Sequence, residues 1–553
     1  MSLAALDVAL LVGKAIGVLG FLLFARFLVW LVNLLLVAPR FDPLRHLPGP
    51  DGGALESHFN QVNDPDITPQ VYKDWTSRFG KTFRYHGYGR HDYRLMSFDL
   101  RVLSHILLSP TYQKPWQTRQ YLGRLLGRGV FNMEGAEHRY LRKLIGPVFT
   151  AQAVKDVSGV YFQKAEELTD RWETLLCAGS GDSATFDVAH WVLRTTFDIF
   201  GLAGLDYHFN ALLDESEAVY SAFRTMFCIS DKSSQLRVLK QLYLPVVERI
   251  WPDEADIITQ RCLKTIHECG MALIETKRQA ILAEKSDFQS QEKDMLSLLI
   301  KSNLAADPSA RLSDRELLDQ ITSFLFAGSD TTALAITWCL RYLSLHPNIQ
   351  QKLREELGDA GTTSQVDVLD GLPYLDAVLR ETLRFTPPVH GTLRVATVDD
   401  LIPISSPVTL RDGTVVTETE HIRIRKGTFV HIPLEGINMS EDIWGSDAQT
   451  FNPDRWLSSS HSGPIQAFPG LANLMSFSFG RAACPGYRFA LVEAKVVIAA
   501  LVRQFSFEPV VGLEIGMYNC VMTKPFVRQA GRCASDGVGL PLKVTRVDTQ
   551  HRV

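Results

Sequence analysis

One cysteine near the C-terminal end lies in a loop whose residue types suit a thiolate held against a flat cofactor. Cys484 has a glycine four positions before it, at Gly480, and another two positions after it, at Gly486. Phe477 stands seven positions before the cysteine, and the glycines would let the backbone approach a flat ring closely. A helical pattern, Tyr487–Phe505, follows, and a helix N-terminus favours the anionic form of a nearby thiol. A lone cysteine is usually a small buried hydrophobe, but this setting favours a ligand.

A second candidate site lies within the long apolar helical pattern Asp314–Leu345. It contains the small residues Ala327 and Gly328, followed by an acid and an alcohol, Asp330 and Thr331. Glycine within a helix is less favourable than alanine by about 1 kcal/mol, so its presence predicts that something presses against the backbone there. The alternative is a loop or a helix start, because Asp and Thr are good N-caps. Apolar residues on both sides favour one long helix with a local distortion.

Basic residues form a third group. The helical pattern Glu137–Phe149 carries His138 and Arg142 four positions apart, and therefore on one face. Arg394 follows a pair of prolines at the end of another helical pattern. From the residues alone, a solvated basic helix face is one interpretation of this pattern.

These segments, taken in order, resemble the cytochrome P-450 family, whose haem loop reads Phe-x-x-Gly-x-Arg-x-Cys-x-Gly. The matching residues are Phe477, Gly480, Cys484 and Gly486. The chain departs from the family at one position of this loop, because the arginine two positions before the cysteine is replaced by alanine, while Arg481 stands one position earlier. The resemblance extends over roughly residues 45 to 545.

The resemblance implies haem b as the cofactor and Cys484 as the axial ligand of its iron. A thiolate ligand pushes electron density to the iron and favours cleavage of the O–O bond, which is typical of a monooxygenase. Thr331 would hydrogen-bond the dioxygen molecule, and Asp330 would help to relay protons from solvent. His138 stands where the family usually has tryptophan. The residues expected to contact the haem ring or its propionates are His138, Arg142, Arg394, Phe477, Gly480, Arg481 and Gly486.

A Glu-x-x-Arg pair, Glu381 and Arg384, lies in the helical pattern Tyr374–Phe385, and Arg455 follows before the cysteine loop. An exposed pair of this kind would contribute only about 0.5 kcal/mol. The apolar residues around it predict burial instead. The resemblance implies that the three side chains form a structural network beneath the haem, with no catalytic role.

The implied reaction inserts one atom of O2 into a lipophilic small molecule, by hydroxylation or epoxidation. The chain resembles fungal members of the cytochrome P-450 family that act on terpenoids or other secondary metabolites. No fused flavin or nicotinamide domain is evident, so electrons would come from a separate membrane-bound NADPH-cytochrome reductase. A haem-thiolate isomerase or dehydratase and a non-enzymatic haem sensor remain alternatives. The segments expected to line the substrate site are rich in Phe, Leu, Met and Ile; they are Trp116–Met133, Phe223–Pro252, Ser323–Ala327 and Pro387–Thr392.

The N-terminal segment predicts a membrane anchor. Ala15–Ala38 is apolar apart from Arg26 and one asparagine, and about 20 such residues can cross a bilayer as a helix. Arg26 opposes insertion by roughly 2–3 kcal/mol, which the apolar neighbours offset. Basic residues follow at Arg40 and Arg45, which predicts that the remaining chain faces the cytoplasm. The resemblance places such an anchor in the endoplasmic reticulum membrane.

Composition and element patterns predict the fold class. The 553 residues carry a formal net charge of −4 and no Lys/Arg block, which argues against nucleic acid as a partner. The eight cysteines show no zinc-site spacing. Helical patterns dominate, so we expect a mainly α protein with small β-sheets (α+β) in the cytochrome P-450 fold. The expected parts are an anchor (1–38), a proline-rich hinge (39–50) and one haem domain (51–553). The further patterns are helices over Val154–Leu176 and Ile257–Ala283, and strands over Thr82–Tyr85, Arg94–Phe98 and parts of Val395–Ile432.

Overall fold

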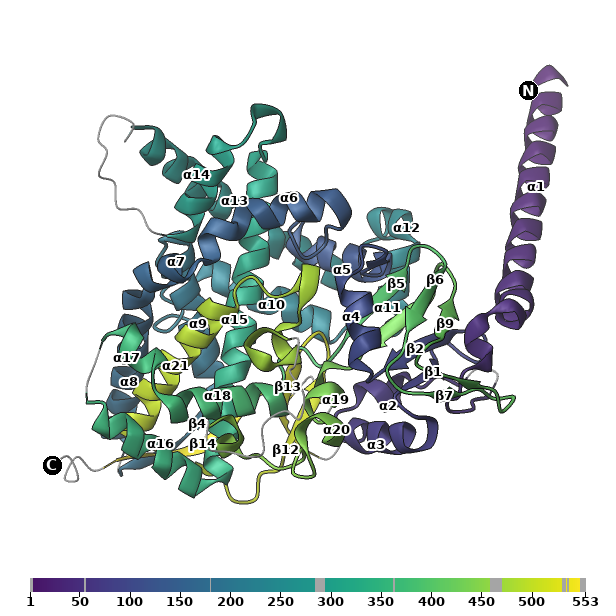
Figure 1. The fold of residues 1–553 in the computed structure, drawn as a ribbon. Coiled ribbons are helices and arrows are strands. Elements are labelled where there is room, and N and C mark those ends of the chain that lie inside the picture. The colour runs from purple at the N-terminus through teal and green to yellow at the C-terminus, as the bar shows by residue number, and fades with distance from the viewer. Residues whose placement is uncertain are drawn as a thin grey trace. The chain divides into compact units, whose positions relative to one another are not determined.

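The computed structural model describes residues 3–53, 56–179, 181–283, 294–361, 364–457, 470–529, 534 and 537–547. The chain is mainly helical with several small sheets, as predicted (Figure 1). It forms two compact units, and each is described by itself. The first unit comprises residues 1–62, 70–112 and 393–432, and the second comprises residues 63–69, 113–392 and 433–553.

The chain starts with a long apolar helix. Helix α1 covers Leu3–Val32 and continues into a π-helical turn, Asn33–Val37. The segment Gly20–Phe41 is long and apolar enough to cross a membrane, and none of it is buried within the protein. Two short 3-10 helices, Ala38–Phe41 and Pro43–His46, follow, each with a proline at its start. This agrees with the predicted anchor, while the boundaries of the anchor, hinge and haem domain stay predictions.

A five-stranded sheet in the order β1-β2-β10-β5-β3 organises the first unit. Strands β1 and β2 are antiparallel, with Thr82 opposite Ser97, and β10 runs parallel to β2, with Phe429 opposite Arg94. The strands predicted from the sequence are thereby confirmed. The sheet strands are β1 (Thr82–His86), β2 (Tyr93–Ser97), β10 (Phe429–Ile432), β5 (Thr392–Ala396) and β3 (Tyr112–Gln113). Two further antiparallel pairs are present: β6 (Asp400–Pro403) pairs with β9 (His421–Ile424), and β7 (Val408–Thr409), which lies between them in the chain, pairs with β8 (Val415–Val416).

The second unit is built around one central helix. Helix α15 has the predicted bounds, Asp314–Leu345, and begins with a capping box in which Ser313 and Glu316 satisfy each other's backbone N–H groups. Twenty-four of its side chains are buried, so it is enclosed on nearly all faces. The helices that pack most extensively against it are α9 (Val188–Leu205), α13 (Glu254–Ala283), α18 (Pro373–Phe385) and α21 (Tyr487–Gln504) (Figure 1).

The other predicted helices are also present, with two divisions. The pattern Glu137–Phe149 is α-helical to Ile145 and ends in a 3-10 turn, Gly146–Phe149. The pattern Val154–Leu176 begins inside α7 and continues into α8, because the chain leaves the helix at Val157. The remaining helices are α2 (Phe59–Asn63), α3 (Thr68–Phe79), α4 (Leu100–Leu108), α5 (Trp116–Leu126), α6 (Gly135–Ile145), α7 (Ala151–Asp156), α8 (Ser158–Ala178), α10 (Ala218–Asp231), α11 (Gln235–Tyr243), α12 (Pro245–Ile250), α14 (Met295–Ala305), α16 (Pro347–Asp359), α17 (Val366–Asp370), α19 (Leu434–Asn438) and α20 (Glu441–Trp444).

Two small sheets complete the second unit. One has the order β11-β14-β4 and is antiparallel throughout, and the other is the hairpin β12-β13. Their strands are β4 (Ser183–Asp187), β11 (Phe505–Pro509), β12 (Ile515–Asn519), β13 (Thr523–Val527) and β14 (Pro541–Arg546).

Candidate functional site

The cysteine loop is closed by a backbone hydrogen bond. The N–H of Cys484 donates to the carbonyl oxygen of Phe477 at 2.9 Å, which folds the intervening residues back on themselves. Gly480 has φ of +72°, in the left-handed region that favours glycine. At Gly486, a Cβ atom would lie 3.4 Å from the Phe149 ring, so a side chain there would press on that ring. Helix α21 begins directly after this glycine. Glycine is therefore favoured at position 480 by the backbone conformation, and at position 486 by the lack of space for a side chain.

The surroundings of the Cys484 sulfur hold it as a thiol when no metal is bound. Burial raises the pKa of the Cys484 thiol to about 11, although the N–H of Gly486 and the charge of Arg142 act in the opposite direction. A metal ion bound to the sulfur would supply the missing positive charge and deprotonate it. Cys484 therefore has the chemistry of a ligand whose ionisation is coupled to binding of a cationic centre.

Three cationic or N–H donor groups lie near this cysteine. His138 and Arg142 project from the same face of α6, and the charges of Arg142 and Arg481 both act on His138. Burial, followed by the charge of Lys114, lowers the pKa of His138 to about 4, so its ring is neutral at pH 7 and offers one N–H. Within the described part of the chain, the side chains of His138, Arg142 and Arg481 make no hydrogen bond or ion pair. Unpaired donors at a partly buried site predict an anionic ligand.

Arg394, the fourth predicted donor, lies on β5 in the first unit. Its guanidinium is buried, and its Nη1 donates to the carbonyl oxygen of Leu393 at 2.8 Å. Its proposed contact with the cofactor therefore stays a prediction.

The acid–alcohol pair lies in the middle of α15, and the helix is continuous there. The predicted local distortion is wrong: residues 327–332 are α-helical, and the Thr331 hydroxyl donates to the Ala327 carbonyl oxygen at 2.6 Å. Gly328 is needed because a Cβ atom there would lie 2.4 Å from the Phe200 ring of α9. Close helix packing, accommodated without a break in the helix, explains the glycine.

Asp330 is buried among charged groups of other elements. Burial raises the pKa of its carboxyl group, while the positive charges of Lys524 and Arg224 lower it and the charge of Asp231 raises it. Lys524 and Asp231 form an ion pair with each other. Burial and the nearby cations therefore shift the pKa of Asp330 in opposite directions. Such opposing effects suit a group that takes up and releases protons.

Phe149 connects α15 to the cysteine loop. Its ring lies against Gly486 on one side, and it meets the ring of Phe324 edge-on, with the centroids 5.5 Å apart. Phe324 lies two turns before Thr331 on the same helix. The cysteine loop and the acid–alcohol helix therefore border one region, as two faces of a single cofactor site would require. Phe149 was not among the predicted site residues.

Three of the four predicted substrate-lining segments also meet at α15. Phe227 of α10 stacks on Phe326 with centroids 4.4 Å apart and an interplanar angle of 9°. A Cβ atom on Gly129 would lie 1.9 Å from the Ser323 hydroxyl oxygen. The fourth segment, Pro387–Thr392, lies next to β13, where the Pro388 carbonyl accepts a hydrogen bond from the backbone N–H of Thr523 at 2.9 Å.

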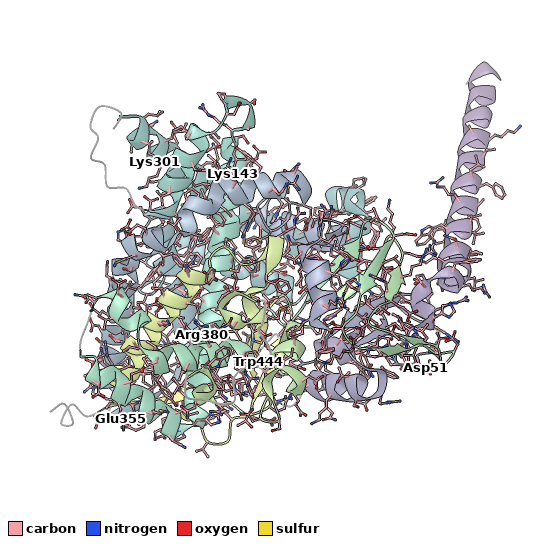
Figure 2. The ribbon with its side chains drawn as sticks, in the orientation of Figure 1. Asp51, Lys143, Lys301, Glu355, Arg380 and Trp444 are labelled. Atoms are coloured by element: carbon pink, nitrogen blue, oxygen red, sulfur yellow. The ribbon has the colours of Figure 1, made fainter. Side chains whose placement is uncertain are left out.

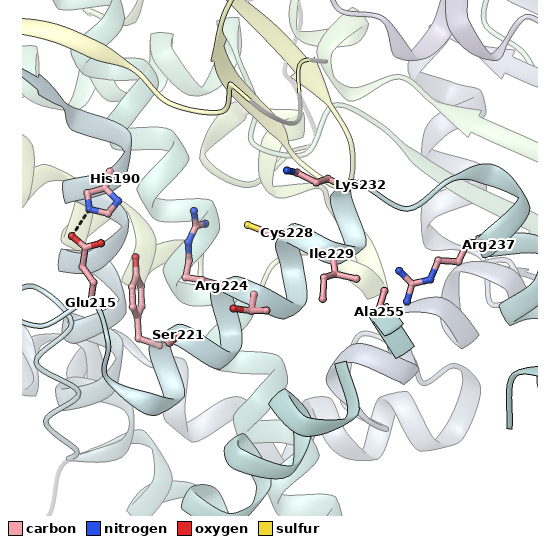
Figure 3. Close-up of a pocket in the computed structure, with 11 residues that line it drawn as sticks. His190, Glu215, Ser221, Arg224, Cys228, Ile229, Lys232, Arg237 and Ala255 are labelled. Atoms are coloured by element: carbon pink, nitrogen blue, oxygen red, sulfur yellow. Dashed lines mark hydrogen bonds and ion pairs between the residues drawn. The ribbon is translucent and has the colours of Figure 1, made fainter. Parts of the chain in front are cut away.

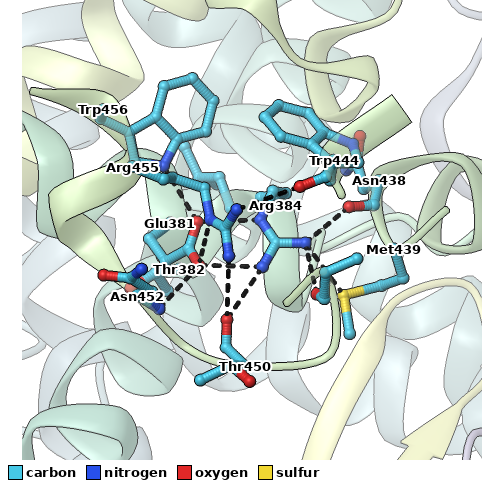
Figure 4. A network of polar contacts seen from close by, with 12 residues as sticks. Glu381, Thr382, Arg384, Asn438, Met439, Trp444, Thr450, Asn452, Arg455 and Trp456 are labelled. Carbon is cyan, nitrogen blue, oxygen red and sulfur yellow. Dashed lines mark hydrogen bonds and ion pairs between the residues drawn. The ribbon is translucent and has the colours of Figure 1, made fainter. Parts of the chain in front are cut away.

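The predicted Glu-Arg-Arg network is confirmed in detail (Figure 4). Glu381, which is fully buried, accepts two hydrogen bonds of 2.8 Å from Arg384 and one of 3.0 Å from Arg455. Trp456 Nε1 and the backbone N–H of Asn452 also donate to it, at 2.9 and 2.8 Å. The arginines donate their other N–H groups to backbone carbonyl oxygens of residues 438–450, and Arg455 also pairs with the Asp447 carboxylate at 2.9 Å. This network ties α18 to the segment that leads into the cysteine loop.

Glu493 was missed in the sequence. It lies on α21 and is fully buried, and burial raises its pKa well above the usual value, which favours the neutral acid. The hydroxyls of Thr332 on α15 and Tyr161 on α8 are its polar neighbours. The sequence signal was weak, because Lys495 follows two positions later and the two charges together resemble an ordinary polar face of a helix.

The donor set around Cys484 fits a haem. A haem combines a metal for the sulfur with acidic propionates for the unpaired donors of His138, Arg142 and Arg481, and its flat ring suits the glycine-bordered loop. No cluster of three or more His, Cys, Asp or Glu residues that could hold a separate metal ion occurs among the described residues.

Comparisons with known proteins agree with this chemistry. The sequence model of the cytochrome P-450 family matches residues 47–524. Cytochrome P-450 monooxygenase 205 of Postia placenta is 37% identical over 534 residues, which cover 93% of this chain and 95% of the relative. Ganoderic acid synthetase of Ganoderma lucidum is 34% identical over 518 residues, which cover 88% and 91%. A crystal structure of a cytochrome P-450 matches with a TM-score of 0.67 at 24% identity and covers 92% of this chain and 100% of that chain.

The family match spans most of the chain, and the fungal relatives match nearly end to end. The predicted cysteine loop, acid–alcohol helix and Glu-Arg-Arg network occur together in one unit. The chain belongs to the cytochrome P-450 family and is a haem b monooxygenase whose iron takes a cysteine thiolate as axial ligand.

Proposed function

We propose that Cys484 is the axial ligand and that His138, Arg142, Arg394 and Arg481 bind the haem propionates. The observation that carries this assignment is the set of unpaired donor groups on α6 and in the cysteine loop, next to a thiol that needs a cation to ionise. Phe477, Gly480 and Gly486 would shape the surface on which the ring lies. The bound haem supplies activation of O2, and the protein supplies binding, orientation and protons.

Asp330 and Thr331 are the proposed catalytic side chains. The reaction places one oxygen atom in the substrate and releases the other as water, which consumes two electrons and two protons. Asp330 would take protons from solvent, and the Thr331 hydroxyl would pass them on towards the oxygen while accepting replacements. Burial raises the pKa of Asp330, which makes its protonated form easier to reach than that of an exposed aspartate.

The substrate is proposed to be a lipophilic terpenoid or another secondary metabolite of a fungus. The aromatic residues that meet at α15, among them Phe227, Phe324 and Phe326, support an apolar ligand. The relative named ganoderic acid synthetase is consistent with such a substrate class. Electrons would come from a separate NADPH-cytochrome reductase, whose acidic surface the exposed Lys143 on α6 would attract (Figure 2).

The N-terminal helix is proposed to hold the protein in the endoplasmic reticulum membrane, with the haem domain on the cytoplasmic side. Its apolar segment and the basic residues after it support this arrangement. A lipophilic substrate dissolved in the bilayer would then reach the enzyme without crossing water.

Reconstitution tests the proposal directly. The full chain would be placed in phospholipid vesicles with a fungal NADPH-cytochrome reductase and a panel of terpenoids under 18-oxygen gas. We expect products that carry one labelled oxygen atom and form only when NADPH is present. Turnover of a peroxide without NADPH, together with no NADPH-dependent product, would instead support the isomerase or dehydratase alternative.

Thr331→Ala is expected to lower product formed per NADPH roughly 100-fold, because the hydroxyl that passes protons is lost. The measurement is product and NADPH consumption in the reconstituted system. Thr322→Ala is the matched control, since its hydroxyl donates to the Leu318 carbonyl oxygen at 3.0 Å on the same helix, as Thr331 does to Ala327. Equal losses in both variants would mean that helix packing, and not proton transfer, explains the effect.

Arg142→Gln is expected to speed haem loss roughly 10-fold, because a charge-assisted hydrogen bond to a propionate disappears. Haem transfer to apomyoglobin measures this rate. Arg139→Gln removes the same charge from an exposed position of the same helix and should change the rate little. Similar rates for the two variants would contradict the assignment of Arg142.

A further inference from the structure

Helix α10 has a polar face that the proposed reaction does not use. Its buried face carries Phe223, Met226 and Phe227, which pack into the core of the second unit. The opposite face carries Ser221, Arg224, Thr225 and Cys228 at spacings of three and four residues, followed by Lys232. These polar residues therefore form one continuous stripe along the helix.

This stripe forms one wall of a pocket of about 680 Å³ (Figure 3). The other walls come from His190 on α9, Glu215 before α10, Arg237 on α11 and Ala255 on α13. The volume lies within the range of small-molecule sites, roughly 300–1,000 Å³. The lining around Arg224 is polar, and Ile229 and Ala255 add a small apolar surface on the side away from His190 in Figure 3, where Lys232 and Arg237 also lie.

Most charges in this pocket are already paired. Glu215 accepts from His190 at 3.0 Å and from Arg194 at 2.6 Å, so its carboxylate is occupied. Arg237 pairs with Asp256 at 2.9 Å. Arg224 differs, because its guanidinium makes no hydrogen bond or ion pair with any described residue.

The carboxyl groups whose charges reach Arg224 do not satisfy it. Asp231 is paired with Lys524, and burial disfavours the anionic form of Asp330 by raising its pKa. The side-chain hydroxyls of Ser221 and Thr225, one on either side of Arg224 on the helix, also lack hydrogen bonds to the described residues. A partly buried guanidinium flanked by free hydroxyl donors is a receptor for a carboxylate, which accepts two parallel hydrogen bonds from arginine.

We propose that this pocket binds an amphipathic organic carboxylate, with its carboxylate on Arg224 and its apolar part against Ile229 and Ala255. The site lies on the polar face of α10, opposite the face that carries Phe227, and the charge of Arg224 also acts on Asp330. Arg224 supplies the charge, and the α10 stripe supplies hydroxyl donors beside it.

Cys228 provides a local readout on the holoenzyme. It is exposed, lines the pocket one helical turn after Arg224, and lies beside it in Figure 3. Dodecanoate is the probe, and dodecanol is its neutral counterpart. We expect dodecanoate to slow alkylation of Cys228 by iodoacetamide, followed by peptide mass spectrometry, while dodecanol at the same concentration does not. Cys177 on α8 is also exposed and serves as the internal control thiol.

Arg224→Gln should weaken the apparent affinity for dodecanoate roughly 10- to 100-fold, as expected for loss of a charged hydrogen-bond donor, and Arg224→Lys should restore part of it. Absence of protection in the wild type would overturn the proposal. Equal protection by dodecanol, or full protection in Arg224→Gln, would overturn the assignment of a carboxylate to Arg224. Haem content, followed by the Soret band, confirms that each variant is folded, so the result is independent of monooxygenase activity.

Discussion

Cys484→Ala is expected to abolish both the long-wavelength Soret band of the reduced carbon monoxide complex and all NADPH-dependent product. The physical reason is that the sulfur is the group that would donate electron density to the iron opposite the carbon monoxide. The structure gives this thiol no charge partner within its loop strong enough to ionise it alone, and burial raises its pKa to about 11. The spectral band would therefore report a thiolate that iron binding stabilises.

Cys484→His separates ligation from folding. An imidazole can still bind iron, so this variant should retain haem but show an ordinary haem–carbon monoxide band. Cys262→Ala, which removes another buried thiol from α13, should leave the shifted band unchanged. Persistence of the shifted band in Cys484→Ala would refute Cys484 as the ligand, and an ordinary band in the wild type would point to a protonated or displaced sulfur.

Sequence patterns predicted most elements of the second unit because its helices are long and strongly periodic. Helix α15 has the predicted bounds at both ends, since an apolar pattern and a Ser-x-x-Glu capping box both act locally. The Glu381 network was also predictable, because a charged pair within an apolar helix must be buried with its partners. Its additional acceptors, such as the carbonyl of Ala448, were not, because a backbone atom leaves no trace in residue type.

The failed and missed predictions have a common cause, which is packing between elements distant in the sequence. Gly328 suggested a distorted helix, but its reason is a single ring, that of Phe200, located 128 positions earlier. Arg481 departs from the family motif by one position, yet its charge reaches His138 on α6. No local sequence pattern shows that Gly328 packs against Phe200, or that Arg481 comes close to His138. The pocket at Arg224 is likewise created by α9, α10, α11 and α13 together.

Glu381→Gln is expected to lower the free energy of unfolding by about 3 kcal/mol, because the buried Arg384 loses its counter-ion while Arg455 keeps only the carboxylate of Asp447. Glu381, Arg384 and Arg455 all have essentially no exposed surface, so water cannot replace the lost carboxylate. The midpoint of urea unfolding, followed by circular dichroism and by haem release, measures the effect.

A control variant at an exposed ion pair tests whether burial is the reason for the large loss of stability. Glu508 accepts a hydrogen bond of 2.9 Å from Lys543, and about half of each side chain is exposed to water. Glu508→Gln should therefore change the free energy of unfolding by less than about 1 kcal/mol. The network also holds the segment that leads into the cysteine loop, so haem release should occur at a lower urea concentration than loss of helix in Glu381→Gln. If the two Gln variants unfold alike, the network would contribute no more than a surface ion pair, and the cysteine loop would have to be positioned by its own closing hydrogen bond and by Phe149.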